Sequence, residues 1–165
     1  MDHDPVTGFL VYAGFRSSLA RELSRARREH RSLTLGLVSV GGWEAYLSEK
    51  GPAAADKVIR QIAAFFEDGC RDFDTTGRYS PSIFSIIFPG LSVDHGVGVV
   101  SRILGGVLKK TASVKGAESL VLRAAVAGYP HDASTTERLM EIAEASLFKT
   151  VDAKSGDVAR WTEET

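Results

Sequence analysis

The amino-acid sequence predicts an α+β sandwich, in which helices cover a central and mainly antiparallel sheet. Helical and strand-like hydrophobic patterns alternate along the whole chain, and no repeat, low-complexity tract or linker interrupts them. Of the 165 residues, 44% are hydrophobic and 25% are charged, as in an ordinary globular protein that can bury a substantial core. We therefore expect residues 1–165 to form a single domain.

The first half of the chain predicts three helices and one strand. The two longer helices show apolar residues at helical spacing, with charged residues between them, which is the pattern of an amphipathic helix. The strand alternates, is rich in branched residues and is expected to end at Gly41-Gly42, while Gly69-Cys70 closes the second long helix. In chain order, we expect a helix at residues 15–26, a strand at 33–40, a short helix at 43–47 and a helix at 52–70.

The second half predicts a β-hairpin, followed by a helix, a strand, a helix and an edge strand. Ser80-Pro81 separates the hairpin strands, because proline fixes φ for a tight turn. Ser134 and Glu137 have the spacing of a capping box, so the last helix is expected to begin there. We expect these elements at residues 73–79, 82–88, 99–108, 119–128, 134–147 and 157–161. The complete order of elements is typical of a ferredoxin-like topology.

Charge and cysteine content exclude several classes of protein. Lys and Arg number 20 and Asp and Glu 21, so we expect no general binding to nucleic acid or to anionic membranes. No apolar run could span a bilayer and the N-terminus is acidic, so we predict a cytoplasmic protein with no membrane segment. The single cysteine, Cys70, excludes an internal disulfide, and the histidines lack metal-ligand spacing.

Five segments, distributed over nearly the whole chain, have a familiar order and spacing. They are Asp4-Pro-Val-Thr-Gly-Phe9, Arg71-Asp-Phe-Asp74, Arg78-Tyr79, Val126-Ala-Gly-Tyr-Pro130 and Ala143-Glu-Ala-Ser-Leu-Phe148. Together they resemble the GGDEF family of diguanylate cyclases. The resemblance implies a nucleotidyl-cyclase-like sandwich. It also implies the site at which active members join two GTP molecules into cyclic di-GMP, with metal ions held by carboxylates.

The turn that carries catalysis in the family has changed in this sequence. The family's Gly-Gly-Asp/Glu-Glu-Phe reads Ser80-Pro81-Ser82-Ile83-Phe84, so only the phenylalanine remains. Pro81 lacks a backbone donor and the flexibility of glycine, and Ile83 has no atom that could bind a metal.

The other active-site positions have changed as well. Ser39 and Gly41 replace two metal-binding aspartates, and Val151 replaces a phosphate-binding lysine. Of the guanine-binding pair, the asparagine position is Leu47, whereas the aspartate is kept as Asp56, which alone is better explained as a solvated carboxylate near a helix N-terminus. We therefore predict a degenerate domain with no diguanylate cyclase activity and no Mg²⁺ cofactor.

The family's inhibitory site, or I-site, is retained. Arg71 and Asp74 form its Arg-x-x-Asp motif in the correct register before the turn, and the matching arginine of the next helix is Arg102. A guanidinium offers parallel donors to guanine O6 and N7, and a carboxylate accepts from N1–H and the amino group. Glycines one helical turn before and after Arg102 would leave room for a flat ligand. Alternatively, Arg71 and Asp74 form an ordinary surface ion pair and Arg102 is merely solvated.

Two functions of different classes remain. We predict a non-catalytic cyclic di-GMP receptor in bacterial second-messenger signalling, which acts through a ligand-linked homodimer, a protein partner or a neighbouring domain. The start at Asp4-Pro-Val-Thr suggests a domain of a larger regulator. The alternative is a nucleotide-independent interaction or dimerisation module, with Trp43 and the helix at residues 15–26 as its contacts. For Trp43 and Tyr46, packing inside the protein is the favoured role.

Overall fold

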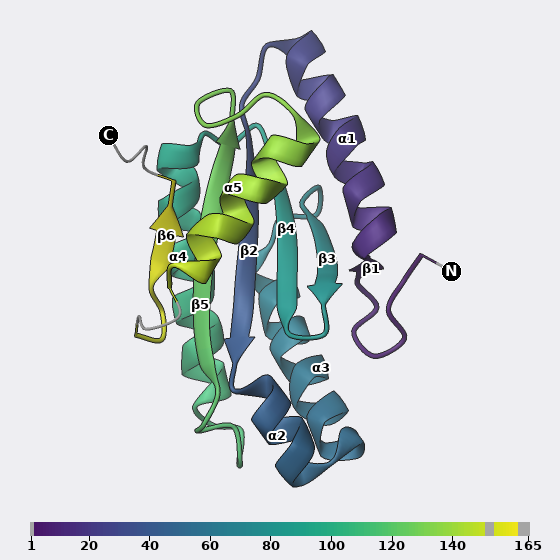
Figure 1. The fold of residues 1–165 in the computed structure, drawn as a ribbon, viewed down its shortest axis with the longest axis vertical. Helices are drawn as coiled ribbons and strands as arrows, with labels where there is room; N and C mark the ends of the chain where they lie inside the picture. Colours follow the sequence, from purple (N-terminus) through teal and green to yellow (C-terminus); the bar gives the residue numbers. More distant parts are fainter. Residues whose placement is uncertain (1, 151–153, 162–165) are drawn as a thin grey trace.

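A computed structural model describes residues 2–150 and 154–161, and these residues form the predicted α+β sandwich (Figure 1). Six strands make one mixed sheet in the order β1-β3-β4-β2-β5-β6. The central strand β2 pairs antiparallel with β4 and β5, β3 pairs antiparallel with β4, and the edge strands β1 and β6 run parallel to β3 and β5. The strands are β1 (Leu10–Val11), β2 (Leu33–Gly41), β3 (Thr75–Ser80), β4 (Ile83–Pro89), β5 (Val121–Tyr129) and β6 (Val158–Arg160).

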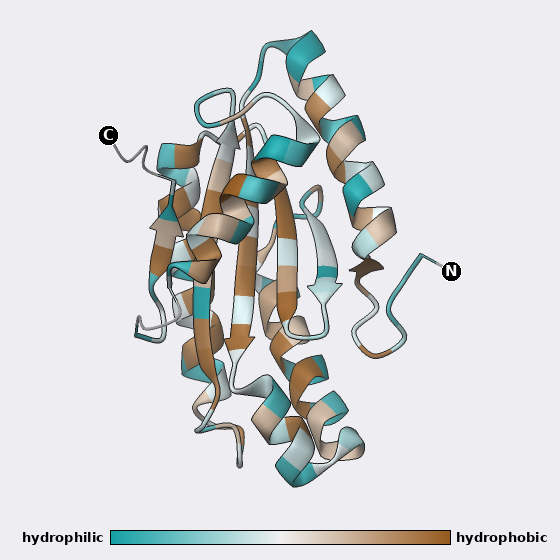
Figure 2. Ribbon diagram, viewed as in Figure 1, coloured by the Kyte–Doolittle hydropathy of each residue, from teal (hydrophilic) through white to brown (hydrophobic). Residues whose placement is uncertain are grey.

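The described residues also form five helices, which cover both faces of the sheet. They are α1 (Tyr12–Glu29), α2 (Trp43–Lys50), α3 (Pro52–Gly69), α4 (Val93–Thr111) and α5 (Thr136–Phe148). α1 and α5 lie on one face and α3 and α4 on the other, while α2 leaves the end of β2 and packs against α3 (Figure 1). The central strands are mostly hydrophobic, whereas hydrophobic and hydrophilic residues alternate along the helices (Figure 2).

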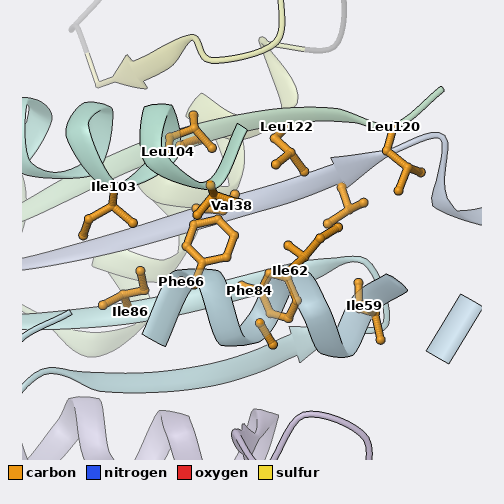
Figure 3. Close-up of a cluster of buried hydrophobic side chains, with 14 of the residues drawn as sticks. Val38, Ile59, Ile62, Phe66, Phe84, Ile86, Ile103, Leu104, Leu120 and Leu122 are labelled. Carbon is orange, nitrogen blue, oxygen red and sulfur yellow. The ribbon is translucent and has the colours of Figure 1, made fainter. Parts of the chain in front are cut away.

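The sheet is buried on both faces, so β2 is an almost continuous apolar run. Leu37 belongs to the core beneath α1 and α5, and the next residue, Val38, to the core beneath α3 and α4. In the second core, the rings of Phe66 on α3 and Phe84 on β4 lie 5.4 Å apart (Figure 3). Burying each of these side chains contributes about 1.5–3 kcal/mol, which holds the hairpin firmly against α3.

The hairpin differs slightly from its predicted boundaries. The strand predicted at residues 73–79 begins at Thr75, because residues 71–74 form a turn of their own. The turn between β3 and β4 consists of Pro81 and Ser82 rather than Ser80-Pro81, since Ser80 is still paired with Ile83.

The capping box predicted at Ser134 and Glu137 is wrong. Thr135 is the N-cap of α5: its backbone is extended and its hydroxyl accepts the N–H of Arg138 at 3.2 Å. Glu137 lies in the first turn of the helix and pairs with Arg16 on α1 at 2.7 Å. The helix therefore begins one residue later than the motif indicates.

Several single residues have structural roles. Trp43 and Tyr46 are buried, which rules out Trp43 as the exposed contact of an interaction module. Cys70 follows the last residue of α3. Burial, with the charges of Asp74 and Glu67, raises the pKa of its thiol to about 12, so the thiol stays protonated.

Among the described residues, no helix combines the length and the apolar composition that crossing a bilayer requires.

Candidate functional site

The β3–β4 hairpin carries the candidate residues at its two opposite ends. We call residues 80–83 the turn end, and residues 71–74 together with Pro89 the open end. At the turn end, the Val40 N–H donates to the Ser82 carbonyl at 2.8 Å, so the turn lies against the end of β2. In Figure 1, β3 runs down from the open end to the turn end.

Arg78 holds the turn end in place. Its Nη2 donates to the Pro81 carbonyl at 2.9 Å, and its Nη1 pairs with the Asp4 carboxylate at 3.2 Å. The same carboxylate accepts from the Thr7 N–H at 2.9 Å and from the Thr7 hydroxyl at 2.7 Å. Burial opposes ionisation of Asp4, but the Thr7 hydrogen bonds and the Arg78 charge outweigh it and lower the pKa of this carboxyl.

The turn end does not fit the metal ions that the resemblance implies. Ser39 on β2 is the register partner of Ile83 on β4, and Gly41 lies further along the same strand, so the changed positions do come together. Their side chains provide no carboxylate, and the part of the chain that the structure describes has no group of three His, Cys, Asp or Glu residues that could hold a metal. Phe84, the retained member of the turn motif, is buried and meets the ring of Phe9 edge-on at 5.7 Å, which is a packing role.

The positions at which the resemblance implies a guanine-binding pair and a phosphate-binding lysine do not provide a nucleotide-binding set either. Leu47 is exposed on α2, and Asp56 lies half-buried near the start of α3. Among the described residues, the Asp56 carboxylate has no hydrogen bond or ion pair. The Leu47 side chain has no polar atom, so the two residues do not form a base-binding pair. Val151 falls outside the described residues.

At the open end, Arg71 and Asp74 are bonded to each other. The Asp74 N–H donates to the Arg71 carbonyl at 3.0 Å, and one Asp74 oxygen accepts the Arg71 N–H at 2.8 Å, which closes a tight turn. The Arg71 Nη2 donates to Asp74 Oδ1 at 2.8 Å, and its Nε donates to Oδ1 at 3.0 Å and to Oδ2 at 3.2 Å. The guanidinium therefore contacts both carboxylate oxygens, so the pair is bidentate. The side chain of Asp74 is 1% exposed and that of Arg71 41%, so this is no ordinary surface pair.

Two further groups orient Arg71, and the sequence analysis missed both. Its Nη2 also donates to the Pro89 carbonyl at 3.2 Å, and its guanidinium lies 4.3 Å from the centre of the Phe73 ring. Phe73 is 61% exposed, whereas we expected it inside a strand. Its place between the two motif residues, within a turn, is the signal that could have shown it to be exposed.

Arg102 lies on the exposed face of α4, where several glycines clear the surface. A Cβ added to Gly98, Gly105 or Gly106 would meet no atom within 4 Å, so packing does not require these glycines. Arg102 and Gly106 line a cavity of about 270 Å³ that reaches Gly69, two residues before Arg71. The structure thus places Arg102 beside the end of the helix that leads into the motif, although no hydrogen bond joins Arg102 to Arg71 or Asp74 among the described residues.

A comparison with protein-family models decides the family. The model described as "Diguanylate cyclase, GGDEF domain" matches residues 1–156. The chain belongs to the GGDEF family.

This GGDEF domain is 23% identical over 147 residues to diguanylate cyclase DgcP of Pseudomonas aeruginosa, and the match covers 88% of this chain but 22% of DgcP. It is 20% identical over 128 residues to diguanylate cyclase A of Treponema denticola, which covers 77% of this chain and 34% of that protein. The chain thus spans a minor part of these relatives.

Solved structures of GGDEF domains share the fold. The GGDEF domain of DgcB from Caulobacter crescentus, solved in complex with c-di-GMP, superposes with a TM-score of 0.84 at 17% identity, covering 96% of this chain and 92% of that one. Diguanylate cyclase SiaD from Pseudomonas aeruginosa, solved with its activator SiaC, superposes with a TM-score of 0.85 at 21% identity, covering 96% of this chain and 61% of that one.

Proposed function

We propose that this GGDEF domain is a non-catalytic receptor for cyclic di-GMP. The observation that carries the proposal is the bidentate Arg71–Asp74 pair at the open end, beside the cleared face of α4 that bears Arg102. Guanine is recognised well by such a set, because an arginine supplies two parallel donors and a carboxylate accepts from the base. A neighbour in fold, DgcB, was solved with c-di-GMP bound.

Binding would change the pairing at the open end. The Nε and Nη2 of Arg71 donate to Asp74 and Pro89, and among the described residues no partner is seen for Nη1, which can meet an incoming guanine first. Asp74 is covered in the free domain, so it can accept from the base only after the Arg71 side chain turns away. The backbone bonds of the turn can hold Asp74 in place during this exchange.

We propose that the domain does not synthesise cyclic di-GMP, and the residues at the turn end support this part of the proposal. Ser39, Gly41 and Ile83 offer no carboxylate to neutralise a triphosphate through Mg²⁺, so we propose that the domain needs no metal cofactor. We further propose a cytoplasmic signalling role, in which ligand-linked dimerisation or a partner protein gives the output. The structure of SiaD with its activator SiaC shows that a GGDEF-containing protein can have such a partner.

A melting experiment tests the receptor proposal. Any ligand that binds only the folded state raises the melting temperature, since it stabilises that state by RT ln(1 + [L]/Kd). We expect cyclic di-GMP at 100 times its Kd to add about 2.7 kcal/mol of stability. GTP with Mg²⁺ should leave the melting temperature unchanged and give no cyclic di-GMP on prolonged incubation.

Two outcomes contradict the proposal. Formation of cyclic di-GMP from GTP would show an active cyclase. Indifference to both nucleotides would leave the nucleotide-independent interaction module, whose contacts would then lie elsewhere than Trp43.

A further inference from the structure

A cavity of about 350 Å³ lies between the last turns of α1, the start of β2 and the end of β4. Phe73, whose ring packs on the Arg71 guanidinium, and Pro89, whose carbonyl accepts from it, both line the cavity. Arg71 itself does not line it. The cavity therefore adjoins the open end on the side of α1, whereas Arg102 lies on α4, on the opposite face of the sheet (Figure 1).

Much of the cavity surface is apolar. Ala26 on α1 and Leu33 on β2 are buried side chains that line it, and the Phe73 ring beside them is 61% exposed. The volume lies within the roughly 300–1,000 Å³ that is typical of pockets for small molecules. A ligand with one aromatic ring could therefore cover these side chains and pack against Phe73.

Arg31 brings a guanidinium to the cavity. A Cβ added to Gly90 would collide with this guanidinium, so the Arg31 side chain lies directly over the turn that follows β4. Gly90 has a φ of +76°, and its N–H donates to the Ser32 carbonyl at 2.8 Å, which fixes the turn beside the start of β2. Within the described part of the chain, the Arg31 side chain has no hydrogen bond, ion pair or ring contact, so its donors can meet a ligand.

Two glutamates of α1 also line the cavity, and a single arginine lies near both. The Arg25 Nε donates to Glu29 at 3.1 Å, and this bond, with the charges of Glu29 and Glu22, raises the pKa of Arg25. The Glu22 carboxylate has no hydrogen bond or ion pair of its own to any described residue, although the side chain is half-buried. Glu22 is thus an acceptor without a donor, and the charges of the two glutamates, Arg25 and Arg31 cancel.

We propose that this cavity binds a free aromatic amino acid. Such a molecule is a zwitterion: its carboxylate pairs with Arg31, since a planar guanidinium matches a carboxylate bidentately, and its ammonium donates to Glu22. Its ring rests on Ala26 and Leu33 and meets the Phe73 ring edge-on or offset, as aromatic pairs prefer. Nucleotides fit less well, because the described lining has no net charge to offset their phosphates.

The probe for the test is L-phenylalanine, titrated into the ¹⁵N-labelled chain. We expect the amide signals of residues 26, 31, 33 and 90 to shift with dose and to saturate. Two analogues each lack one charge: N-acetyl-L-phenylalanine has no ammonium, and L-phenylalaninamide has no carboxylate. Each should bind at least about tenfold more weakly than L-phenylalanine, which is 1.4 kcal/mol. L-Alanine, which lacks the ring, should bind at least about fivefold more weakly.

Two substitutions assign the charges. Arg31→Gln should weaken L-phenylalanine and the N-acetyl analogue about tenfold and leave the amide unchanged, because the amide has no carboxylate to pair. Glu22→Gln should weaken L-phenylalanine and the amide about tenfold and leave the N-acetyl analogue unchanged. The analogue that each variant still binds shows that its cavity is intact. Arg28→Gln, an exposed position of the same helix outside the lining, should change none of these affinities.

Three results would overturn the proposal: equal affinity for L-phenylalanine and either analogue, binding that neither Arg31→Gln nor Glu22→Gln changes, or no saturating shifts at the cavity residues. None of these results depends on whether the open end binds cyclic di-GMP. Arg102→Ala, which the proposed function expects to weaken cyclic di-GMP, should leave the binding of L-phenylalanine unchanged.

Discussion

The open end and the turn end of the β3–β4 hairpin lie roughly 20 Å apart along the same two strands, yet their chemistry differs in kind. At the open end, a buried carboxylate holds an exposed guanidinium in a bidentate pair. At the turn end, serine, proline and isoleucine stand where the family places glycines and carboxylates, and the turn is fixed by Arg78. We propose that this hairpin has kept a ligand-binding set at one end and has lost a metal-binding set at the other.

This difference shows how little of the scaffold each task requires. In our proposal, guanine recognition at the open end needs one tight turn, two side chains and a cleared helix face. Catalysis needs several carboxylates from β2 and the turn, held against glycines that admit the substrate. The fold itself depends on neither set, because Phe84, Phe66 and Val38 form the core between them (Figure 3). Each end can therefore be changed without unfolding the other.

The largest expected effect is the loss of ligand affinity in Arg71→Ala. We expect cyclic di-GMP to bind at least about thirtyfold more weakly in isothermal titration calorimetry, because truncating one partner of a buried, charge-assisted contact costs about 2–5 kcal/mol. The affinity of Arg71→Lys should lie between those of the wild type and Arg71→Ala, since lysine keeps the charge but not the planar set of donors. Arg21→Ala, an exposed arginine on α1, is the matched control. Unchanged affinity in Arg71→Ala would remove the open end from the account.

The turn end should respond in stability instead. Asp4→Asn removes a charged acceptor of Arg78 and Thr7, so urea denaturation at pH 7 should show a loss of about 1–3 kcal/mol. The folded pKa of Asp4 lies below its ordinary value of 3.8, so its contribution is present above that pH and is lost as the pH falls further. Wild type and variant should therefore converge as the pH falls through the folded pKa of Asp4. A parallel drop in cyclic di-GMP affinity would show that the two ends are coupled.

The glycines of α4 should have opposite effects on stability and on binding. Gly98→Leu with Gly105→Leu fills the cleared face, so cyclic di-GMP should bind at least about tenfold more weakly. Helix propensity should meanwhile raise stability by about 0.5–1 kcal/mol per site. Gly105→Ala is the control: its Cβ meets no atom within 4 Å, so stability should rise and affinity stay the same. Full affinity in the double leucine variant would mean that the ligand does not use this face.

The smallest expected effect is that of Phe73→Ala. The ring lies against the Arg71 guanidinium, and an exposed contact of this kind is worth about 0.5–1 kcal/mol, or roughly a two- to fivefold loss of affinity. Phe73→Tyr should retain the affinity, because its ring can stack in the same way. Calorimetry on both variants gives the comparison, and equal values for Ala and Tyr would show that Phe73 is not a positioning residue.

Most of the fold follows from the hydrophobic patterns, because each long helix buries one face at helical spacing and the central strands are nearly continuous apolar runs. The two-residue strand β1 is too short to show a hydrophobic period. The sequence offers neighbouring Ser and Thr residues as candidates for the N-cap of α5, and only the backbone geometry shows which of them caps the helix. Motif spacing predicts Arg71, Asp74 and Arg102 as site residues, and this assignment stays a prediction. The ion pair of Arg71 with Asp74 was an open alternative from the sequence, but the burial of the Asp74 side chain could not be predicted, because it depends on the turn that closes residues 71–74.

A cavity of about 250 Å³ beside the turn end, lined by residues that include Ser39, Ile83, Arg123 and Phe148, could not be predicted from the sequence. Arg123 is close to Ser39 only through the register of β5 against β2, and a single sequence does not show that register. Phe148 is different: it lies one helical turn after Glu144, on the exposed face of α5, so the helical period of the sequence already indicates that it is exposed.

The most direct test of the central claim is to find which end of the hairpin responds to nucleotide. Cyclic di-GMP, and separately GTP with Mg²⁺, would be titrated into the ¹⁵N-labelled domain and the amide shifts followed. We expect cyclic di-GMP to shift the amide signals of residues 71–74 and of the neighbours of Arg102, and GTP with Mg²⁺ to leave the amide signals of residues 39–41, 80, 82 and 83 unchanged. Metal-dependent shifts at the turn end, or an open end silent to cyclic di-GMP, would contradict the account.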